Sequence, residues 1–439
     1  IAYAAPDNNP GSGSGVAIGT GSNAPKTENV AVGKGAGISY SNGASNATGD
    51  IVVGNGANIN NYASQGGSVA IGKNAKIENM AGGVEASFAL GQTTFSGSWF
   101  SSARIPADPT KVVGSVAIGD NTFARTGSTM IGSHNYKGKL GDIDVDSATT
   151  RTYALNAYAT TIGANSFSNG AFTTNTGVYN IMSSEYNGGR LANPLKNFGA
   201  TITGSLNSIE SQTATNRYAG IANSIVGTAN RTFNSNGSIV MGAGNEITNS
   251  ITTISAPSDG GNSAKALADN LRGAIKDSKS GGATMALGGG NKADYTLRTS
   301  IIGVNNTITG ASGDESTNNL SMGVDNTADK VKNTTVIGTE NNITNSTGTL
   351  VLGDKRTITN ANHAVVMGSS DNGTTMNVDD AVAVGHNTDV SVAGGAAIAS
   401  EAKAGVDKGE VGYDPSKKAA STETNATWKS TRAAVSVGD

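Results

Sequence analysis

The segment at residues 335–368, TVIGTENNITNSTGTLVLGDKRTITNANHAVVMG, decides the fold of this chain. It contains three near-copies of a short phrase in which two apolar residues precede glycine, at 336–338, 351–353 and 366–368. The three glycines that end these copies are evenly spaced along the chain. A phrase that returns at a fixed spacing indicates a repeat architecture in which each copy forms one structural unit.

The phrase recurs along the whole chain in 17 clear copies. The closest copies recur at intervals of about 13–15 residues, and the wider intervals mark insertions between repeat units. Two degraded copies end at Gly199 and Ala399. The structural repeat glycines that end the clear copies are Gly19, Gly33, Gly54, Gly72, Gly91, Gly119, Gly132, Gly163, Gly227, Gly242, Gly288, Gly303, Gly323, Gly338, Gly353, Gly368 and Gly385.

Many repeat units contain a second apolar position, five residues after the glycine. It is occupied by Ile59, Ile77, Ile247, Ile308, Ile343, Ile358 and Val390. Alternation with period two predicts short β-strands. We therefore expect two strands per unit of about 14–15 residues, stacked as parallel rungs of a β-solenoid. The glycine is expected where the backbone needs a positive φ or approaches the next rung closely.

The interior of such a short coil has room for only a few small side chains. We expect the outer two apolar residues of each phrase to fill it and the middle residue to face outward. The resulting apolar stripe on the outside favours association along the length of the roll. Aspartate at Ala70, Ala117 and Ala383 is then expected to disrupt the assembly before the coil. The middle residues in question include Ala17, Ala31, Val52, Ala70, Ala89, Ala117, Val240, Ala286, Val351 and Ala383.

Composition argues against several classes of protein. The 439 residues include 61 glycines, 5% aromatic residues and 14% charged residues, with a formal net charge of −3. A basic face for nucleic acid is therefore not expected. The chain has no cysteine, which excludes disulfides and cysteine metal sites. No apolar run is long enough to span a membrane, so we expect no direct membrane insertion. Residues 1–15 contain Ala2-Tyr3-Ala4 and are interpreted as a flexible N-terminus with a signal remnant.

The phrase SVAIG at 68–72 and 115–119, repeated at this spacing, resembles the head repeats of trimeric autotransporter adhesins, the YadA-like head. The closing sequence at 412–439 resembles the segment that leads from such a head into its neck. The resemblance covers 16–439. It implies an all-β, left-handed parallel β-roll, with three chains side by side in a homotrimer. It also implies a place on the surface of a Gram-negative bacterium, anchored to the outer membrane through a C-terminal region absent from this chain.

The expected organisation is a roll at 16–400 and a head-to-neck connecting segment at 401–439. Four insertions interrupt the roll near 93–113, 134–158, 167–222 and 249–283. Aromatic residues with arginine are typical of binding hot spots. The candidate ligand-binding residues are therefore Phe95, Trp99, Phe100, Arg104, Tyr136, Tyr179 and Tyr186. The alternative, in which the aromatic residues bury their own loops against the roll, remains open.

The fourth insertion has a helical pattern. Leu267, Leu271 and Ile275 are spaced by four, with Ala264 and Ala268 on the same side, and Gly281-Gly282 is expected to end the helix. This predicts one amphipathic helix that packs on the roll or on a neighbouring subunit.

Few residues are candidates for a metal site or a catalytic site. The alternating carboxylates of Asp142, Asp144 and Asp146 resemble the start of a calcium loop, but Ser147 stands where that loop needs glycine. A strand with an acidic face explains them equally well. His363 and His386 lie beside repeat phrases and are expected to be turn residues, and His134 stands apart from them. Spacing suggests no Ser-His-Asp or Cys-His arrangement, and we expect no catalytic residues, metal site or cofactor.

The sequence therefore predicts the head of a surface adhesin that is not an enzyme. Its expected partners are two further copies of itself and an extracellular-matrix protein, a host-cell receptor or glycan, or the surface of another bacterium, as in biofilm or coaggregation. Two alternatives remain: a structural spacer without a specific ligand, and a β-helix enzyme acting on polysaccharide.

Overall fold

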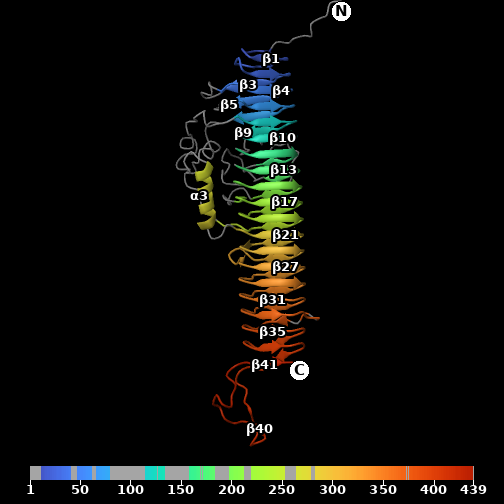
Figure 1. Cartoon of the computed structure of the whole chain (residues 1–439), viewed down its shortest axis with the longest axis vertical. Helices are drawn as coiled ribbons and strands as arrows, with labels where there is room; N and C mark the ends of the chain where they lie inside the picture. Colours follow the sequence, from blue (N-terminus) through green and yellow to red (C-terminus); the bar gives the residue numbers. More distant parts are fainter. Residues whose placement is uncertain are drawn as a thin grey trace, which may run out of the picture. The chain divides into compact units, whose positions relative to one another are not determined.

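The computed structural model describes residues 11–40, 47–61, 66–79, 114–125, 127–133, 158–168, 170, 172–182, 197–211, 219–252, 264–277, 282–371, 373 and 375–438. The chain divides into two compact units, Ile1–Ser238 with Ile251–Gly281, and Ile239–Ser250 with Gly282–Asp439. Both are built from long sheets of short parallel strands (Figure 1). The described part of the chain is therefore all-β apart from one helix, and its architecture is compatible with a β-solenoid.

The first unit contains one long parallel sheet and two shorter ones. The long sheet contains β1 (Val16–Ile18), β2 (Val30–Val32), β4 (Ile51–Val53), β6 (Val69–Ile71), β8 (Val116–Ile118), β10 (Thr129–Ser133), β11 (Thr160–Ala164), β13 (Thr174–Val178), β15 (Thr201–Ser205) and β17 (Ser224–Thr228). The shorter sheets contain β3 (Gly37–Tyr40), β5 (Asn58–Asn61), β7 (Lys76–Asn79) and β9 (Phe123–Arg125), and β12 (Phe167–Ser168), β14 (Ile181–Met182), β16 (Ser208–Glu210) and β18 (Arg231–Phe233).

The second unit repeats this plan. Its long sheet contains β19 (Ile239–Ala243), β21 (Met285–Gly289), β24 (Ser300–Val304), β27 (Leu320–Val324), β29 (Thr335–Thr339), β31 (Leu350–Leu352), β33 (Val365–Met367), β35 (Val382–Val384), β37 (Ala396–Ile398) and β41 (Val435–Val437). Its other parallel strands are β20 (Glu246–Thr248), β22 (Lys292–Asp294), β25 (Thr307–Thr309), β28 (Thr327–Asp329), β30 (Asn342–Thr344), β32 (Thr357–Thr359) and β34 (Thr375–Met376), with β23 (Thr296–Leu297) beside β26 (Ser316–Thr317) and β36 (Asp389–Val390) beside β38 (Lys403–Ala404).

Equivalent residues of successive phrases pair with each other across the ladder. In the opening segment Val336 pairs with Val351, and Val351 pairs with Val366. The second apolar position follows the same rule, because Ile343 pairs with Ile358. Each phrase is thus one rung, as the sequence predicts. The seven named residues of the second position are all buried.

The direction of the phrase residues was predicted incorrectly. The middle residue faces the interior: Ala31, Val52, Ala70 and Ala117 are fully buried. The residues on either side of it face outward. Alternation alone cannot tell which face of a strand is inside. Size does not decide it either, because the buried middle residue is alanine at Ala70 but a larger residue at Met130 and Ile202. The inward position is the same on each of these rungs because equivalent residues pair across the ladder. Aspartate at Ala70, Ala117 or Ala383 would therefore place a charge in the interior and lower the stability of the coil itself.

The repeat glycines combine the two properties expected of them. Gly338 has a φ of 138°, and a Cβ built on it would lie 1.8 Å from the carbonyl oxygen of Gly353 on the next rung. Side chains avoid both the conformation and the contact. Gly353 is an exception, because its φ is not positive, but a Cβ there would still lie 2.3 Å from the Gly368 oxygen.

Ladders of buried asparagine run through both units, three residues after the glycines. In the second unit the ladder contains Asn245, Asn291, Asn306, Asn326 and Asn341. The Nδ2 of Asn326 donates to Oδ1 of Asn306 at 2.9 Å and to the oxygen of Gly338 at 2.7 Å. Each side-chain amide therefore forms hydrogen bonds with both the previous rung and the next. A buried polar group requires such partners. A shorter ladder of Asn180, Asn207 and Asn230 lies in the first unit.

Three rungs, β13, β15 and β41, were missed, and one degraded copy was misread. β13 and β15 lie inside 167–222, so this segment is not a single insertion. Their phrases, TNTG and TITG, carry threonine where the others carry aliphatic residues, and their glycines, Gly177 and Gly204, pair with each other. Gly199 lies in a turn before β15 and ends no rung. The other degraded copy is a rung: β37 precedes Ala399, which has a φ of 86°.

The predicted helix is present as α3 (Ala264–Asp277), with Lys276 in its last turn. Its exposed surface carries ion pairs from Asp269 to Lys265 at 2.7 Å and to Arg272 at 2.6 Å. The expected stop at Gly281 lies outside the described residues.

The segment 401–439 departs from the rungs and then rejoins them. Its excursion contains an antiparallel pair, β39 (Tyr413–Asp414) and β40 (Ala419–Ala420), and projects beyond β41 (Figure 1). Its end, β41, pairs in parallel with β37, so the ladder extends past residue 400.

Candidate functional site

The outward residues of the long sheets form the first candidate surface, here called the outer apolar face. It comprises the residues directly before and after the buried middle residue of each phrase. Val16, Ile18, Ile51, Ile71, Ile131, Ile162 and Val226 are exposed members in the first unit, and Ile239, Met241, Met322, Met367 and Ile398 in the second. A soluble chain rarely exposes aliphatic residues on so many successive strands without a partner.

The outer apolar face is interrupted at β13 and β15. There the outward residues are Thr174, Thr176, Thr201 and Thr203. Next to these threonines, apolar side chains lie at the end of β13 and in the turns that follow β13 and β15. Val178 and Tyr179 are each 40% exposed, and Leu206 is 60% exposed. We call Tyr179 and Leu206 together the Tyr179–Leu206 corner.

The corner spans two adjacent rungs. Val178 pairs with Ser205, and the amide of Leu206 donates to the oxygen of Val178 at 3.0 Å. Both corner residues have a positive φ, 56° at Tyr179 and 60° at Leu206. They stand two residues after Gly177 and Gly204, where the other described rungs with a positive φ have glycine, asparagine, alanine or a charged residue.

A second set of bulky residues with positive φ lies at a different turn of the same unit. Tyr158 and Phe172 have φ values of 50° and 55°. Their rings stack with centroids 5.6 Å apart, and Phe172 lies 5.4 Å from the ring of buried Phe198. Burial raises the pKa of the Tyr158 hydroxyl. These residues pack on one another, as the alternative reading of the aromatic residues predicts.

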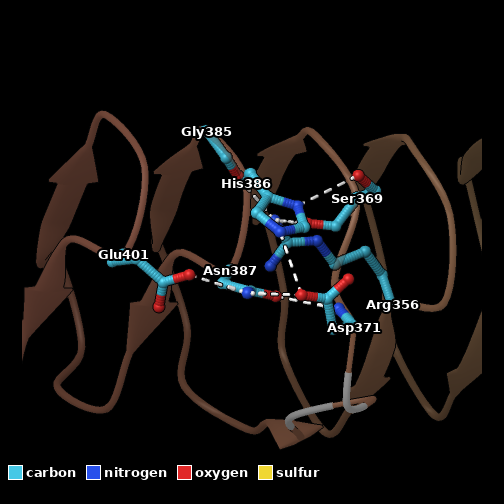
Figure 2. Close-up of polar contacts among 7 residues, drawn as sticks. All are labelled: Arg356, Ser369, Asp371, Gly385, His386, Asn387 and Glu401. Atoms are coloured by element: carbon cyan, nitrogen blue, oxygen red, sulfur yellow. Dashed lines mark hydrogen bonds and ion pairs between the residues drawn. The ribbon is translucent and has the colours of Figure 1, made fainter.

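In the second unit, Arg356 takes the place of asparagine in the buried ladder. The residue is only 4% exposed, and its guanidinium donates to four carbonyl oxygens. Figure 2 draws Arg356 with two of the four residues, Ser369 and Gly385. Nε reaches Gly368 at 2.7 Å, Nη1 reaches Thr388 at 2.8 Å, and Nη2 reaches Gly385 at 2.7 Å and Ser369 at 3.1 Å. Burial lowers the pKa of this guanidinium. One arginine thus donates hydrogen bonds to carbonyl oxygens that follow β33 and β35. These two strands are joined by a longer turn than the strands directly before them.

Beside Arg356, three residues approach the layout of a hydrolytic triad that spacing did not suggest. Nδ1 of His386 lies 3.3 Å from Oγ of Ser369, and Nε2 lies 3.1 Å from Oδ2 of Asp371. Asn387 donates to Asp371 at 3.0 Å and to Glu401 at 2.8 Å (Figure 2). The hydrogen bond from Asn387, together with His386, lowers the pKa of Asp371.

The geometry around Ser369 does not support catalysis. An acyl-transfer site needs free backbone amides to bind the developing oxyanion in a place that excludes water. Here the amide of Ser370 donates to Asp354, the amide of Asp371 donates to Asn387, and the His386 side chain is 43% exposed. The hydrogen bonds of His386 and Asn387 with Ser369 and Asp371 instead connect the longer turn after β33 to the next rung. His386 lies in a turn, and His363 has a φ of 57°, so the prediction for both histidines is confirmed.

A buried carboxylate lies inside the first unit. Asp50 accepts hydrogen bonds from Asn61 at 2.7 Å, from the amide of Ser68 at 2.9 Å and from the Tyr40 hydroxyl at 3.3 Å. Burial raises the pKa of Asp50, and burial is also the main reason that the pKa of Tyr40 rises to about 12. The carboxylate has no exposed surface for a substrate to reach, so its role is structural.

Most of the sequence-predicted ligand-binding residues lie outside the described residues: Phe95, Trp99, Phe100, Arg104, Tyr136 and Tyr186. Asp142, Asp144, Asp146 and His134 also lie outside them, as does the repeat glycine Gly91. Tyr179 is the one predicted contact residue that the structure places, and Leu206 beside it was missed. Two features could have pointed to Leu206: its position two residues after a glycine, and the departure from glycine or asparagine there.

Searches with protein-family models and among curated proteins find no match to this chain. Within the described part of the chain, no helix has both the length and the apolar character needed to cross a membrane. The described residues also contain no cluster of three or more histidine, aspartate or glutamate side chains placed to hold a metal ion.

Proposed function

We propose that this chain is the head of a trimeric autotransporter adhesin on the surface of a Gram-negative bacterium. In this proposal each unit is a left-handed parallel β-roll with coils of about 14–15 residues, stacked rung on rung, and three chains lie side by side. A C-terminal region outside this chain anchors the head to the outer membrane. Its ligands belong to host cells, to the extracellular matrix or to other bacteria, and three copies bind them with avidity.

The outer apolar face is the observation that carries the proposal. Aliphatic residues flank the buried middle residue on rung after rung, and covering them with a second and third copy would remove them from water. Each buried leucine, isoleucine or methionine side chain contributes about 1.5–3 kcal/mol to such an association. The SVAIG phrase supports the adhesin identity, because it resembles the head repeats of that family.

Sedimentation velocity over a range of concentrations tests the assembly. We expect three times the chain mass of 43.7 kDa. Aspartate at the exposed face residues Ile71, Met241 and Met322 should yield folded monomers. Aspartate at Thr176, on the threonine interruption, is the matched control and should leave the assembly intact. A wild-type chain that stays monomeric at every concentration, with and without the region that follows residue 439, would contradict the proposal.

Attachment is tested with beads that carry the wild-type chain. The targets are epithelial monolayers, bacterial lawns and plates coated with collagen, fibronectin or laminin. Attachment to any of these surfaces supports the adhesin. A trimer that attaches to none of them would favour the spacer alternative. Release of reducing ends from polysaccharide would favour the enzyme alternative.

A further inference from the structure

We infer that the Tyr179–Leu206 corner is a contact site for a folded protein partner that offers an uncharged apolar pocket. This inference rests on the proposed adhesin function and deepens it by naming the part of the chain that makes contact and the kind of surface that receives it.

The two corner residues have an unfavourable backbone conformation. A positive φ is unfavourable for residues with a bulky side chain, by about 1–2 kcal/mol each. Glycine or asparagine occupies this turn position on several other rungs of the first unit, as at Gly56, Asn121 and Asn165. Tyrosine and leucine at adjacent rungs therefore reduce the stability of the coil. Residues held in such conformations cluster at functional sites.

The corner residues also differ in packing from the other bulky residues with a positive φ in this unit. Tyr158 and Phe172 share the same backbone conformation, but their rings stack and are partly buried. Leu206, in contrast, is more than half exposed, and the Tyr179 hydroxyl makes no hydrogen bond to another described residue. The exposed surface of this strained apolar pair is therefore available to an external partner.

The chemistry of that partner follows from the charges near the corner. The segments 158–168, 172–182, 200–209 and 219–230 contain no aspartate, glutamate, lysine, arginine or histidine. Glu210 at the end of β16 and Arg231 at the start of β18 form an ion pair with each other at 2.9 Å. A charged partner surface would lose hydration here without gaining an opposite charge, so the complementary surface is uncharged.

Shape favours a protein over a small ligand. Tyr179 and Leu206 stand on turns, where the chain bends from β13 to β14 and from β15 to β16. Small ligands bind in concave sites, whereas a protruding tyrosine or leucine fits into a pocket of a partner. The occupant is not a second copy of this chain, because at these rungs the outer face carries threonines and the apolar groups lie on the turns beside it.

The test compares wild-type chain with the variant Tyr179→Asn/Leu206→Asn. Asparagine suits a positive φ, so the variant should unfold at a higher temperature than the wild type. Beads carrying the variant should attach at least about tenfold more weakly to the monolayers or coated plates that hold wild-type beads, as expected for the loss of two hot-spot residues. Glu340→Asn is the matched control, because Glu340 has a φ of 57° at the equivalent turn position. It should stabilise the chain without weakening attachment.

Each other outcome has one meaning. Unchanged attachment of the double variant overturns the inference but leaves the adhesin proposal standing. A lower sedimenting mass of the variant overturns it as well, because the corner would then contact another copy. If periodate treatment of the target abolishes attachment and trypsin does not, the partner is a glycan and the inference is wrong. Failure of wild-type beads to attach to any surface would instead remove the function on which the inference rests.

Discussion

Replacing Arg356 with methionine tests how the roll tolerates a change in coil length. Methionine fills part of the volume but has no donor. The oxygens of Gly368 and Thr388 would then lose the one hydrogen bond that each accepts from the described residues, whereas Gly385 keeps its bond from Thr388 Oγ1. An orphaned buried carbonyl costs about 1–3 kcal/mol, so two cost about 2–6 kcal/mol.

The substitution also removes an unfavourable contribution, because the wild type must desolvate a cation, as the lowered pKa of Arg356 indicates. This offsets part of the loss in stability. Replacing a buried charge is neutral only where its partners are replaced too, and here the carbonyls remain. We therefore expect a net loss of about 3 kcal/mol in local stability, at the lower end of the range.

Hydrogen exchange is the suitable assay, because stacked rungs open locally and do not need to unfold as one unit. Amides in peptides covering 365–390 should exchange on the order of a hundredfold faster in Arg356→Met than in the wild type. Lys355→Met is the control: this neighbour lies on the exposed turn, and the change should alter exchange by less than about threefold. Equal exchange in Arg356→Met and wild type would refute the view that the guanidinium supports these rungs.

Three further predictions concern the rungs of both units. Ala70→Asp should destabilise the coil by more than about 3 kcal/mol, because it buries a charge, whereas Ile71→Asp should lower the sedimenting mass and leave the circular dichroism spectrum unchanged. Gly338→Ala should lower the free energy of unfolding by at least about 2 kcal/mol, because its Cβ would meet the next rung. Gly35→Ala, where nothing lies within 4 Å of the new Cβ, should lower it by only about 1 kcal/mol. Urea unfolding measures both values. The pKa of Asp50 is raised in the folded state, so its contribution to stability is full below the unfolded value of about 3.9 and is lost as pH rises through the folded value. The difference in unfolding free energy between wild type and Asp50→Asn should therefore change between pH 4 and pH 8 in favour of the variant, and a difference that is constant over this range would contradict the buried-carboxylate assignment.

The sequence alone determined the parts of this fold that depend on local geometry. Glycine at a fixed interval marks positions where a Cβ would meet the next rung, and the alternation around it specifies strands. Both properties belong to the chain before it folds, so the rungs, the buried isoleucines after them and helix α3 were predicted correctly. The rungs of β13 and β15 were missed, because their threonines satisfy the same alternation without the aliphatic signal.

Only the tertiary structure decided which face of each strand is inside. A three-residue strand has the same alternation in either orientation, and only the closing of the chain around its interior makes the middle residue the inward one, whether it is small, as at Ala70, or large, as at Met130 and Ile202. The structure likewise decided what the residues three positions after the glycines do. In the sequence, asparagine at this position is typical of a turn. In the stacked structure its side chain lies inside, where each amide forms hydrogen bonds with the rung on either side. Arg356, Asp371 and His386 meet for the same reason: stacking brings together residues one coil apart in the sequence, and the longer turn between β33 and β35 changes which side chains are buried.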